Sequence, residues 1–243
     1  MSVWRYRALL WIGLCVGPIP LLAQKSSPAP QASTPQAATP QASAPLAPDA
    51  FQQRCRQIRQ KSDMGLPHLS DPVLQSVLDS RCYAFLQTQL PNAATFDQAD
   101  EINSGLQSLL SIYGSKVGDY PAETTQILRV RMMYLLSLEQ AFGNWLHKAP
   151  ASLTQAPEFN QRRANLRADM NNGLGILSQL VGGRAAERGV GVEMRRDIAQ
   201  LLIEIYPKAK MMTDSSLANG LHEAALSDPD ETVQSTLRKV FGS

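Results

Sequence analysis

The sequence has few residues of the types that most often bind metals or haem. It contains three cysteines and three histidines in 243 residues, and no Cys-x-x-Cys pair or Cys/His cluster occurs. Structural zinc sites and covalent haem attachment need such clusters. His222-Glu223 begins like a zinc-protease helix, but Leu226 stands where that motif needs its second histidine. We therefore expect no metal and no cofactor.

Sequence motifs of common hydrolases and nucleotide-binding proteins are also missing. There is no Gly-x-Ser-x-Gly elbow for a nucleophilic serine. The glycine-rich stretch 182–191 follows a predicted helix, whereas a phosphate-binding loop follows a strand and continues into Gly-Lys-Ser/Thr. We interpret this stretch as a flexible connection. No catalytic residue is predicted, although acids such as Asp169, Asp197 and Glu204 on helix flanks leave a hydrolase or transferase as an alternative.

The chain carries little net charge. Its formal charge is +2, and the cations Arg5 and Arg7 lie within residues 1–23, which contain no acid. The remainder of the chain is therefore neutral. Nucleic-acid binding depends on a basic surface, so we expect no nucleic acid among the partners.

The N-terminus has the order of a bacterial secretory signal. Arg5 and Arg7 precede an apolar run, and Ala23 offers a small residue at a cleavage site. We predict that residues 1–23 are a signal peptide and that the mature chain is periplasmic or extracellular, with no stable membrane span. The alternative is an uncleaved segment that anchors the chain in the inner membrane, although residues 8–23 are few for a span and include two prolines.

Residues 24–50 are of low complexity, and a five-residue unit beginning Pro-Gln-Ala recurs in them. This segment has almost no large apolar side chain, so burial cannot offset the entropy lost on ordering it. Regular prolines favour an extended polyproline II chain. We predict a disordered linker, followed by a helical domain that comprises residues 51–243.

The domain is predicted to be all-α because its apolar residues recur at helical spacing and no segment alternates convincingly with the period of a strand. We expect seven or eight amphipathic helices. Residues 121–148 carry the widest apolar arc, about 200° of the helical wheel. A surface helix usually has a narrower stripe, so this segment is predicted to be a central helix covered on several sides. A bundle and a short solenoid both remain compatible with the pattern.

Local patterns predict where some helices begin and where two helices cross closely. The run Thr95-Phe96-Asp97-Gln98 matches a capping box. In the last helix Asp228 is predicted as N-cap and Pro229 as the first helical residue. Gly173 and Gly175 lie inside a predicted helix and weaken it. We favour a close helix crossing over a ligand contact as their role.

Cleavage of the leader would leave two cysteines, Cys55 and Cys82. Both lie on the inward faces of amphipathic segments. An isolated pair in an exported chain is more often bonded than free. We predict a disulfide between them that joins the first two helices and contributes about 3–4 kcal/mol to stability.

Arg131 breaks the apolar pattern of the central helix, because it lies in the middle of the apolar arc. A guanidinium keeps its proton, so a buried one needs hydrogen-bond acceptors. One interpretation is that Arg131, Tyr134 and Trp145 line a pocket for an anionic ligand. The alternative is structural: the side chain reaches solvent, bonds helix-end carbonyls, or meets an acid such as Asp169 or Glu204.

Three classes of function follow. The leading one is an exported, non-catalytic helical module that binds a protein or a cell-envelope component. The second is a small-molecule-binding protein that holds an anionic ligand between helices, and the third is the enzyme with dispersed acids. An exposed apolar patch would favour the first class and a closed polar-lined pocket the second. A shifted carboxyl pKa in a cleft would favour the third.

Overall fold

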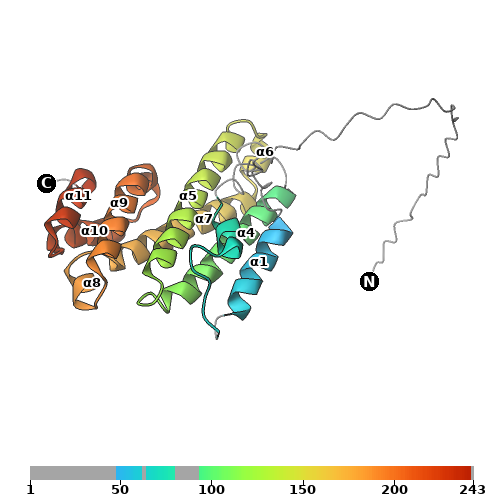
Figure 1. Ribbon diagram of the computed structural model, residues 1–243. Helices are drawn as coiled ribbons and strands as arrows, with labels where there is room; N and C mark the ends of the chain where they lie inside the picture. The colour runs from blue at the N-terminus through green and yellow to red at the C-terminus, as the bar shows by residue number, and fades with distance from the viewer. Residues whose placement is uncertain (1–47, 62–63, 80–92, 242–243) are drawn as a thin grey trace, which may run out of the picture. The chain divides into compact units, whose positions relative to one another are not determined.

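Helices, turns and short connections make up the part of the chain that the structure, a computed structural model, describes: residues 48–61, 64–79 and 93–241 (Figure 1). No strand occurs within these ranges, so the all-α prediction is confirmed. The elements, in chain order, are α1 (Pro48–Gln60), α2 (Pro72–Leu78), α4 (Ala93–Gly114), α5 (Pro121–Leu146), α6 (Ala151–Thr154), α7 (Pro157–Gln179), α8 (Gly183–Glu187), α9 (Val192–Ala209), the 3-10 helix η2 (Lys210–Met212), α10 (Ser215–Ser227) and α11 (Glu231–Phe241).

The predicted leader, residues 1–23, and nearly all of the predicted linker, residues 24–50, lie outside the described ranges and remain predictions. The first helix begins at Pro48, inside the range assigned to the linker. All described residues belong to one compact unit. None of the described helices has a stretch long and apolar enough to cross a membrane.

Helix α5 is the central helix, as predicted. It packs against α4, α7 and α9, and it also contacts α2 (Figure 1). The polar side chains of Gln140, Asn144 and His147 are exposed. Each fully buried Leu, Ile or Phe of its apolar arc contributes about 1.5–3 kcal/mol. The buried apolar residues of α5 are Ile127, Leu128, Val130, Met132, Tyr134, Leu135, Leu138, Ala141 and Phe142.

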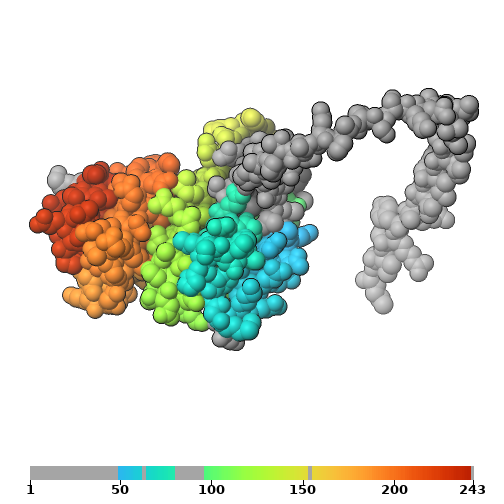
Figure 2. All heavy atoms as spheres, in the orientation of Figure 1, coloured from blue at the N-terminus to red at the C-terminus, as the bar shows by residue number. Residues whose placement is uncertain are grey.

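The N-terminal helices α1 and α2 lie on the α4 side of α5 (Figure 2). Helix α1 buries Phe51, Cys55 and Ile58 on the face that packs on α4. Gly105 of α4 permits this close approach, because a Cβ added there would lie 2.7 Å from Cε1 of Phe51 and 3.2 Å from Sγ of Cys55.

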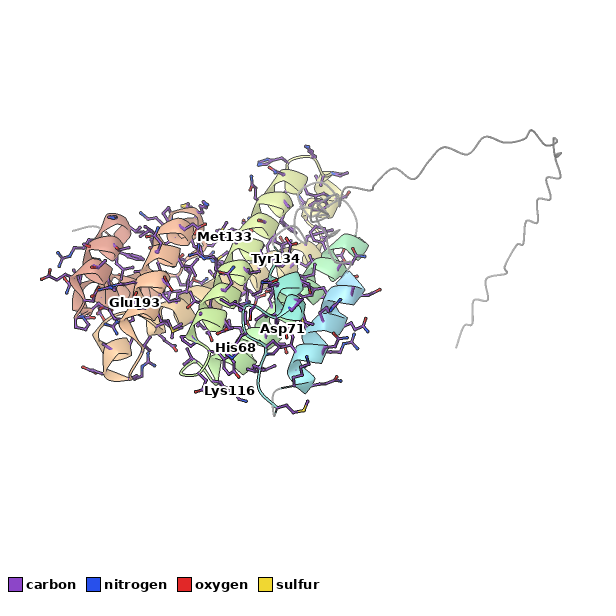
Figure 3. The ribbon with its side chains drawn as sticks, in the orientation of Figure 1. His68, Asp71, Lys116, Met133, Tyr134 and Glu193 are labelled. Atoms are coloured by element: carbon purple, nitrogen blue, oxygen red, sulfur yellow. The ribbon has the colours of Figure 1, made fainter. Side chains whose placement is uncertain are left out.

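The turn before α2 is held on the start of α5. The backbone N–H of Leu66 donates to the Tyr120 hydroxyl at 3.0 Å. The N–H of Leu69 donates to Oε1 of Glu123 at 3.1 Å, and Nδ1 of His68 lies 3.1 Å from the same oxygen (Figure 3). These bonds satisfy the buried Glu123 carboxylate and fix the turn.

The C-terminal helices α9, α10 and α11 lie on the other side of α5 (Figures 1 and 2). Helix α11 packs on both α9 and α10, and α10 also contacts α7 and α8. Val233 and Leu237 are the buried side chains of α11. Through α9, this group of helices is joined to the central helix.

Two predicted helix starts are wrong. Helix α4 begins at Ala93, so Thr95 lies inside the first turn and is not the N-cap. Helix α11 begins at Glu231, and its N-cap is Asp230, whose Oδ1 accepts the Val233 N–H at 3.0 Å. The second prediction failed because a capping pattern is local and either of two neighbouring polar residues, here Asp228 and Asp230, can serve.

The glycine-rich stretch 182–191 also differs from the prediction of a flexible connection. It contains α8, and Ala185 on this helix is fully buried. The N–H of Val190 donates to the Ala185 carbonyl at 3.0 Å, which closes the turn after α8. Gly182 and Gly189 have φ values of 86° and 83°, which supply the left-handed conformations that this path requires.

Candidate functional site

Arg131 is fully buried and has two protein acceptors. Its Nη2 donates to Oδ1 of Asp169 at 3.3 Å, and its Nε donates to Oδ1 of Asn103 at 3.3 Å. Asn103 also donates to Oδ2 of Asp169 at 2.8 Å, so the three side chains form a closed network across α4, α5 and α7. Burial lowers the pKa of Arg131, and the Asp169 charge acts against this shift. Asp169 was one of the predicted acceptors, whereas Asn103 was not foreseen.

One nitrogen of this guanidinium, Nη1, has no hydrogen-bond partner among the described residues. It lies beside Gly173, where an added Cβ would be 3.5 Å from Nη1 and 2.2 Å from Sδ of Met132. The predicted close helix crossing is therefore confirmed at Gly173. It is not found at Gly175, where a Cβ would meet no atom within 4 Å.

Tyr134 and Trp145 are held by contacts other than those of Arg131. The Tyr134 hydroxyl donates to the Ala99 carbonyl at 2.7 Å, on the side of α5 that faces α4 (Figure 3). Trp145 is half-buried and stacks at a tilt on Phe159, with ring centroids 4.6 Å apart. The anionic-ligand role predicted for the three residues remains a prediction.

The hollow nearest to the Arg131 network is small. It is lined by Asn103 and Asp169 among others, and its volume of about 30 Å³ has room for only one or a few waters. An organic anion does not fit in such a space.

One of the two cysteines of the predicted disulfide, Cys82, lies outside the described residues. Cys55 is buried in α1, and its sulfur faces Gly105. Burial raises the pKa of the Cys55 thiol to about 12, which would keep a free thiol neutral and unreactive. The disulfide between Cys55 and Cys82 stays a prediction.

The acids proposed for dispersed catalysis do not gather at one place. Asp169 pairs with Arg131, and Glu204 pairs with Arg129 at 2.6 Å. Asp197 is exposed. Within the described ranges, no group of three or more His, Cys, Asp or Glu is arranged to hold a metal ion.

Asp100 has the most relevant carboxyl pKa shift, because it lies at the small hollow beside Asp169. Burial raises its pKa, and the nearby charge of Arg162 acts against this shift. Arg162 donates to the Asp100 carboxylate at 2.6 Å. The hollow is too small for a substrate, so we do not assign this carboxyl a catalytic role.

A second buried arginine, Arg195 of α9, forms a different kind of site. Its Nε donates to Oδ2 of Asp228 at 3.1 Å, and its Nη1 donates to the Val190 carbonyl at 2.5 Å. Asp228 is fully buried and also accepts the backbone N–H of Gly182 at 2.8 Å and that of Asp230 at 3.0 Å. We call this cluster the Asp228 hub.

The Asp228 hub holds the start of α8 against the end of α10. A Cβ added at Gly182 would lie 2.9 Å from the Cα of Ala224, and one at Gly183 would lie 2.9 Å from the Ser227 carbonyl oxygen. The Gly183 N–H donates to the Ser227 hydroxyl at 3.2 Å. Both glycine N–H groups are therefore used within the chain.

The stretch that the hub holds forms one edge of a surface groove, which we call the α4–α7 groove. Its volume is about 460 Å³. Helices α4 and α7 supply most of its lining, and Arg188 and Val190 come from the connection after α8. Ser111, Gln179 and Arg188 are exposed, so the groove is open to solvent. The lining residues are Gln107, Leu110, Ser111, Gly114, Val117, Thr124, Ile176, Gln179, Leu180, Arg188 and Val190.

Arg188 is the only charged residue among the described residues that line this groove. Its guanidinium is oriented by the chain, because Nε donates to the Arg184 carbonyl at 3.3 Å and Nη2 donates to the Gln179 carbonyl. Gln107 also belongs to the lining, and its side-chain oxygen is buried without a hydrogen-bond partner among the described residues. The groove thus combines apolar walls with one cation and several amide and hydroxyl groups.

A second groove of about 520 Å³ lies between α8 and α10 and shares Gln179 and Arg188 with the first. Its lining carries charges of both signs, because Arg184 and Arg188 face Glu187 and Glu223 there. Such a lining has no preference for a ligand of one charge. The α4–α7 groove is therefore the better-defined candidate site.

Sequence reasoning missed the α4–α7 groove, because its lining comes from four parts of the chain: residues 107–117, Thr124, residues 176–180 and residues 188–190. Its only local signal was the glycine-rich stretch, which was interpreted as flexible. Searches against protein-family models, curated proteins and solved structures find no match to this chain. The function is therefore argued from this geometry alone.

Proposed function

We propose that this chain is an exported, non-catalytic helical module that binds a partner protein through the α4–α7 groove. The observation that carries the proposal is an open groove with mostly apolar walls and a single cation. Open apolar surface on a soluble domain is most often an interaction site. Protein segments present both apolar side chains and main-chain polar groups, which this lining can receive.

The two alternatives have less support. A small-molecule site usually buries most of its ligand, whereas Ser111, Gln179 and Arg188 leave this groove open. Catalysis by dispersed acids would require carboxylates near the groove, but none occurs among the described residues of its lining. The proposal of a binding module therefore rests on both the shape and the composition of the groove.

Export is part of the same proposal, because Arg5, Arg7 and Ala23 occur in the order of a cleavable secretory signal. N-terminal sequencing of the chain from a bacterial envelope fraction should begin at or near Gln24. A chain that retains Met1 and sediments with membranes would support the inner-membrane anchor instead.

Site-specific crosslinking tests whether the groove binds a protein. A photo-crosslinking amino acid is placed at Ser111, inside the groove, and at Ser235, an exposed position on α11, in two versions of the full chain. Irradiation of cells should give a discrete protein adduct from position 111 that is absent from position 235. Identical adduct patterns from both positions, or none from position 111, would contradict the proposal.

A further inference from the structure

We infer that the α4–α7 groove takes the C-terminal end of a partner polypeptide, with an apolar last residue whose carboxylate pairs with Arg188. This inference rests on the proposed function and adds the chemistry of the partner. It follows from the charge of the lining, the shape of the apolar wall and an acceptor that has no donor.

The charge of the groove favours an anionic ligand. Among the described residues of the lining Arg188 alone is charged, and no salt bridge to it is found within the described ranges. Glu187 and Glu223 lie in the lining of the other groove. A guanidinium pairs with a carboxylate through a planar fork that a lysine cannot reproduce. Arg188 would therefore attract a ligand carboxylate that lies in the α4–α7 groove, because the acids Glu187 and Glu223 lie in the other groove.

The orientation of Arg188 suits this role. Two of its nitrogens are tied to the carbonyls of Arg184 and Gln179, so the side chain has lost part of its rotational freedom before a ligand arrives. A preorganised cation loses less entropy on binding than a free one. The two carbonyls accept hydrogen bonds but do not neutralise the positive charge.

The apolar wall lies next to this cation. Leu110 and Thr124 are buried, and Ile176, Leu180 and Val190 are partly exposed around them. A terminal residue carries its carboxylate and its side chain on one Cα, so it can reach the cation and the wall together. A segment from the middle of a chain must also leave the groove in two directions.

Gln107 offers a place for a main-chain N–H of the ligand. Its Oε1 is buried without a donor, and a buried acceptor of this kind is costly. Rotation of the amide toward the groove breaks no hydrogen bond of that oxygen. A ligand N–H would form a hydrogen bond to this oxygen. Binding would thereby remove the desolvation penalty of an unpaired acceptor that the unliganded chain has.

The test uses the mature exported chain and two pools of hexapeptides that end in Leu, Ile, Val or Phe. One pool has free C-terminal carboxylates and the other has C-terminal amides. Retention by the immobilised chain is measured by mass spectrometry. The acid pool should be retained at least about ten-fold better than the amide pool, because only the acid pairs with Arg188.

Variants of the chain show whether the retained peptides bind in the α4–α7 groove. Arg188→Gln should abolish the preference for acids, and Arg188→Lys should restore only part of it. Because Arg188 also bonds two backbone carbonyls, Ser111→Trp provides a second variant that fills the groove and leaves those bonds intact. Ser235→Trp on α11 is the matched control and should bind like the unaltered chain.

Each other outcome has a definite meaning. Equal, groove-dependent retention of acids and amides overturns the C-terminal inference and leaves the proposed function in place. Retention that Ser111→Trp does not reduce, or no retention of either pool, overturns the C-terminal inference, and the crosslinking at Ser111 then decides the proposed function by itself. Myristate, run as a third probe, separates a free fatty acid from a peptide. If myristate is retained through Ser111 and Arg188 and the peptides are not, the inference fails and the small-molecule class replaces the proposed function.

Discussion

The described residues contain two buried arginines, and the surroundings of these two side chains differ. Arg195 pairs with Asp228, which is fully buried and accepts two backbone N–H groups in addition to the guanidinium. Arg131 pairs with Asp169, whose side chain is 38% exposed, and one nitrogen of Arg131 has no partner. The first site is closed, whereas the second leaves one hydrogen bond unmade.

The two sites therefore differ in their structural role: the Asp228 hub holds separate segments together, whereas the Arg131 network is a burial that the fold accommodates. The Asp228 hub ties together the start of α8, the turn before α9 and the start of α11, which are distant in sequence. It thereby holds the stretch that supplies Arg188 and Val190 to the α4–α7 groove. The Arg131 network joins helices that already pack through apolar faces. The chain should therefore depend far more on the first site than on the second.

The largest effect is expected for Asp228→Asn. This substitution keeps the size of the side chain but leaves the buried charge of Arg195 without a counterion, so the free energy of unfolding should fall by about 3–5 kcal/mol. Asp169→Asn is the matched comparison: it also leaves a buried guanidinium, that of Arg131, without a counterion, but the Asp169 carboxylate is 38% exposed and partly hydrated, so the loss should be smaller, about 2 kcal/mol. Urea unfolding followed by far-UV circular dichroism measures both. Equal losses would remove the distinction between the two sites.

The next effect concerns the glycine that donates to Asp228. Gly182 combines φ 86° and ψ 176° with a backbone contact that a Cβ would make at 2.9 Å. Gly182→Ala should therefore cost about 2–4 kcal/mol. Gly189 has a similar φ but open space around it, so Gly189→Ala should cost only about 1–2 kcal/mol. Thermal unfolding of both variants separates close packing from backbone conformation, and a larger loss for Gly189→Ala would contradict this account.

Arg131→Met should change the free energy of unfolding by no more than about 1 kcal/mol, in either direction. The substitution removes a buried charge and a donor that has no acceptor, and the Asp169 carboxylate that it leaves behind is 38% exposed and can be hydrated, so the penalty of a stranded buried ion does not arise. Arg195→Met, in contrast, strands the fully buried Asp228 and should cost about 3–5 kcal/mol. A loss above 3 kcal/mol for Arg131→Met would show that its network is as essential as the hub.

The smallest effect is a pH dependence at the edge of the hub. Hydrogen bonds from Arg196 and from the Val233 N–H hold the pKa of Asp230 below its ordinary value of 3.8. The stability that this carboxylate contributes is present above pH 3.8 and is lost as the pH falls through the lower folded-state pKa. Asp230→Asn keeps an N-cap residue but has no such titration.

Melting temperatures at pH 7 and pH 3 test this expectation. The unaltered chain should lose slightly more stability than Asp230→Asn between the two values. Because Asp230 and Arg196 are a solvent-screened pair, the difference should be smaller than any of the effects above. An identical loss in the two proteins would show that Asp230 does not contribute.

Sequence reasoning succeeded where the physics is short-range. The spacing of Ile127, Leu128, Leu135 and Leu138 was enough to predict the central helix, because burial of one helical face depends on a fixed angle per residue. The same pattern also exposed Arg131 as a misfit and suggested Asp169 among its partners. These inferences use only the positions of residues on a helix and do not require the tertiary structure.

The remaining features depend on tertiary contacts. Asp228 lies in a helix-capping sequence, but in the folded chain its carboxylate accepts hydrogen bonds from Arg195, Gly182 and Asp230. The glycine-rich stretch looked flexible because the α10 backbone against which it packs is distant in sequence. Apart from the glycine-rich stretch, the α4–α7 groove had no sequence signal, because its lining forms only when separate helices meet.

The central claim is that the Asp228 hub holds residues 182–191 in place as a preformed edge of the groove. Amide hydrogen exchange of the folded chain, resolved by NMR, tests it directly. The Gly182 and Gly183 amide protons, which donate to Asp228 and Ser227, should exchange as slowly as those inside α9, and Asp228→Asn should remove this protection. Exchange of both glycines at the rate of an unstructured peptide in the unaltered chain would contradict the account.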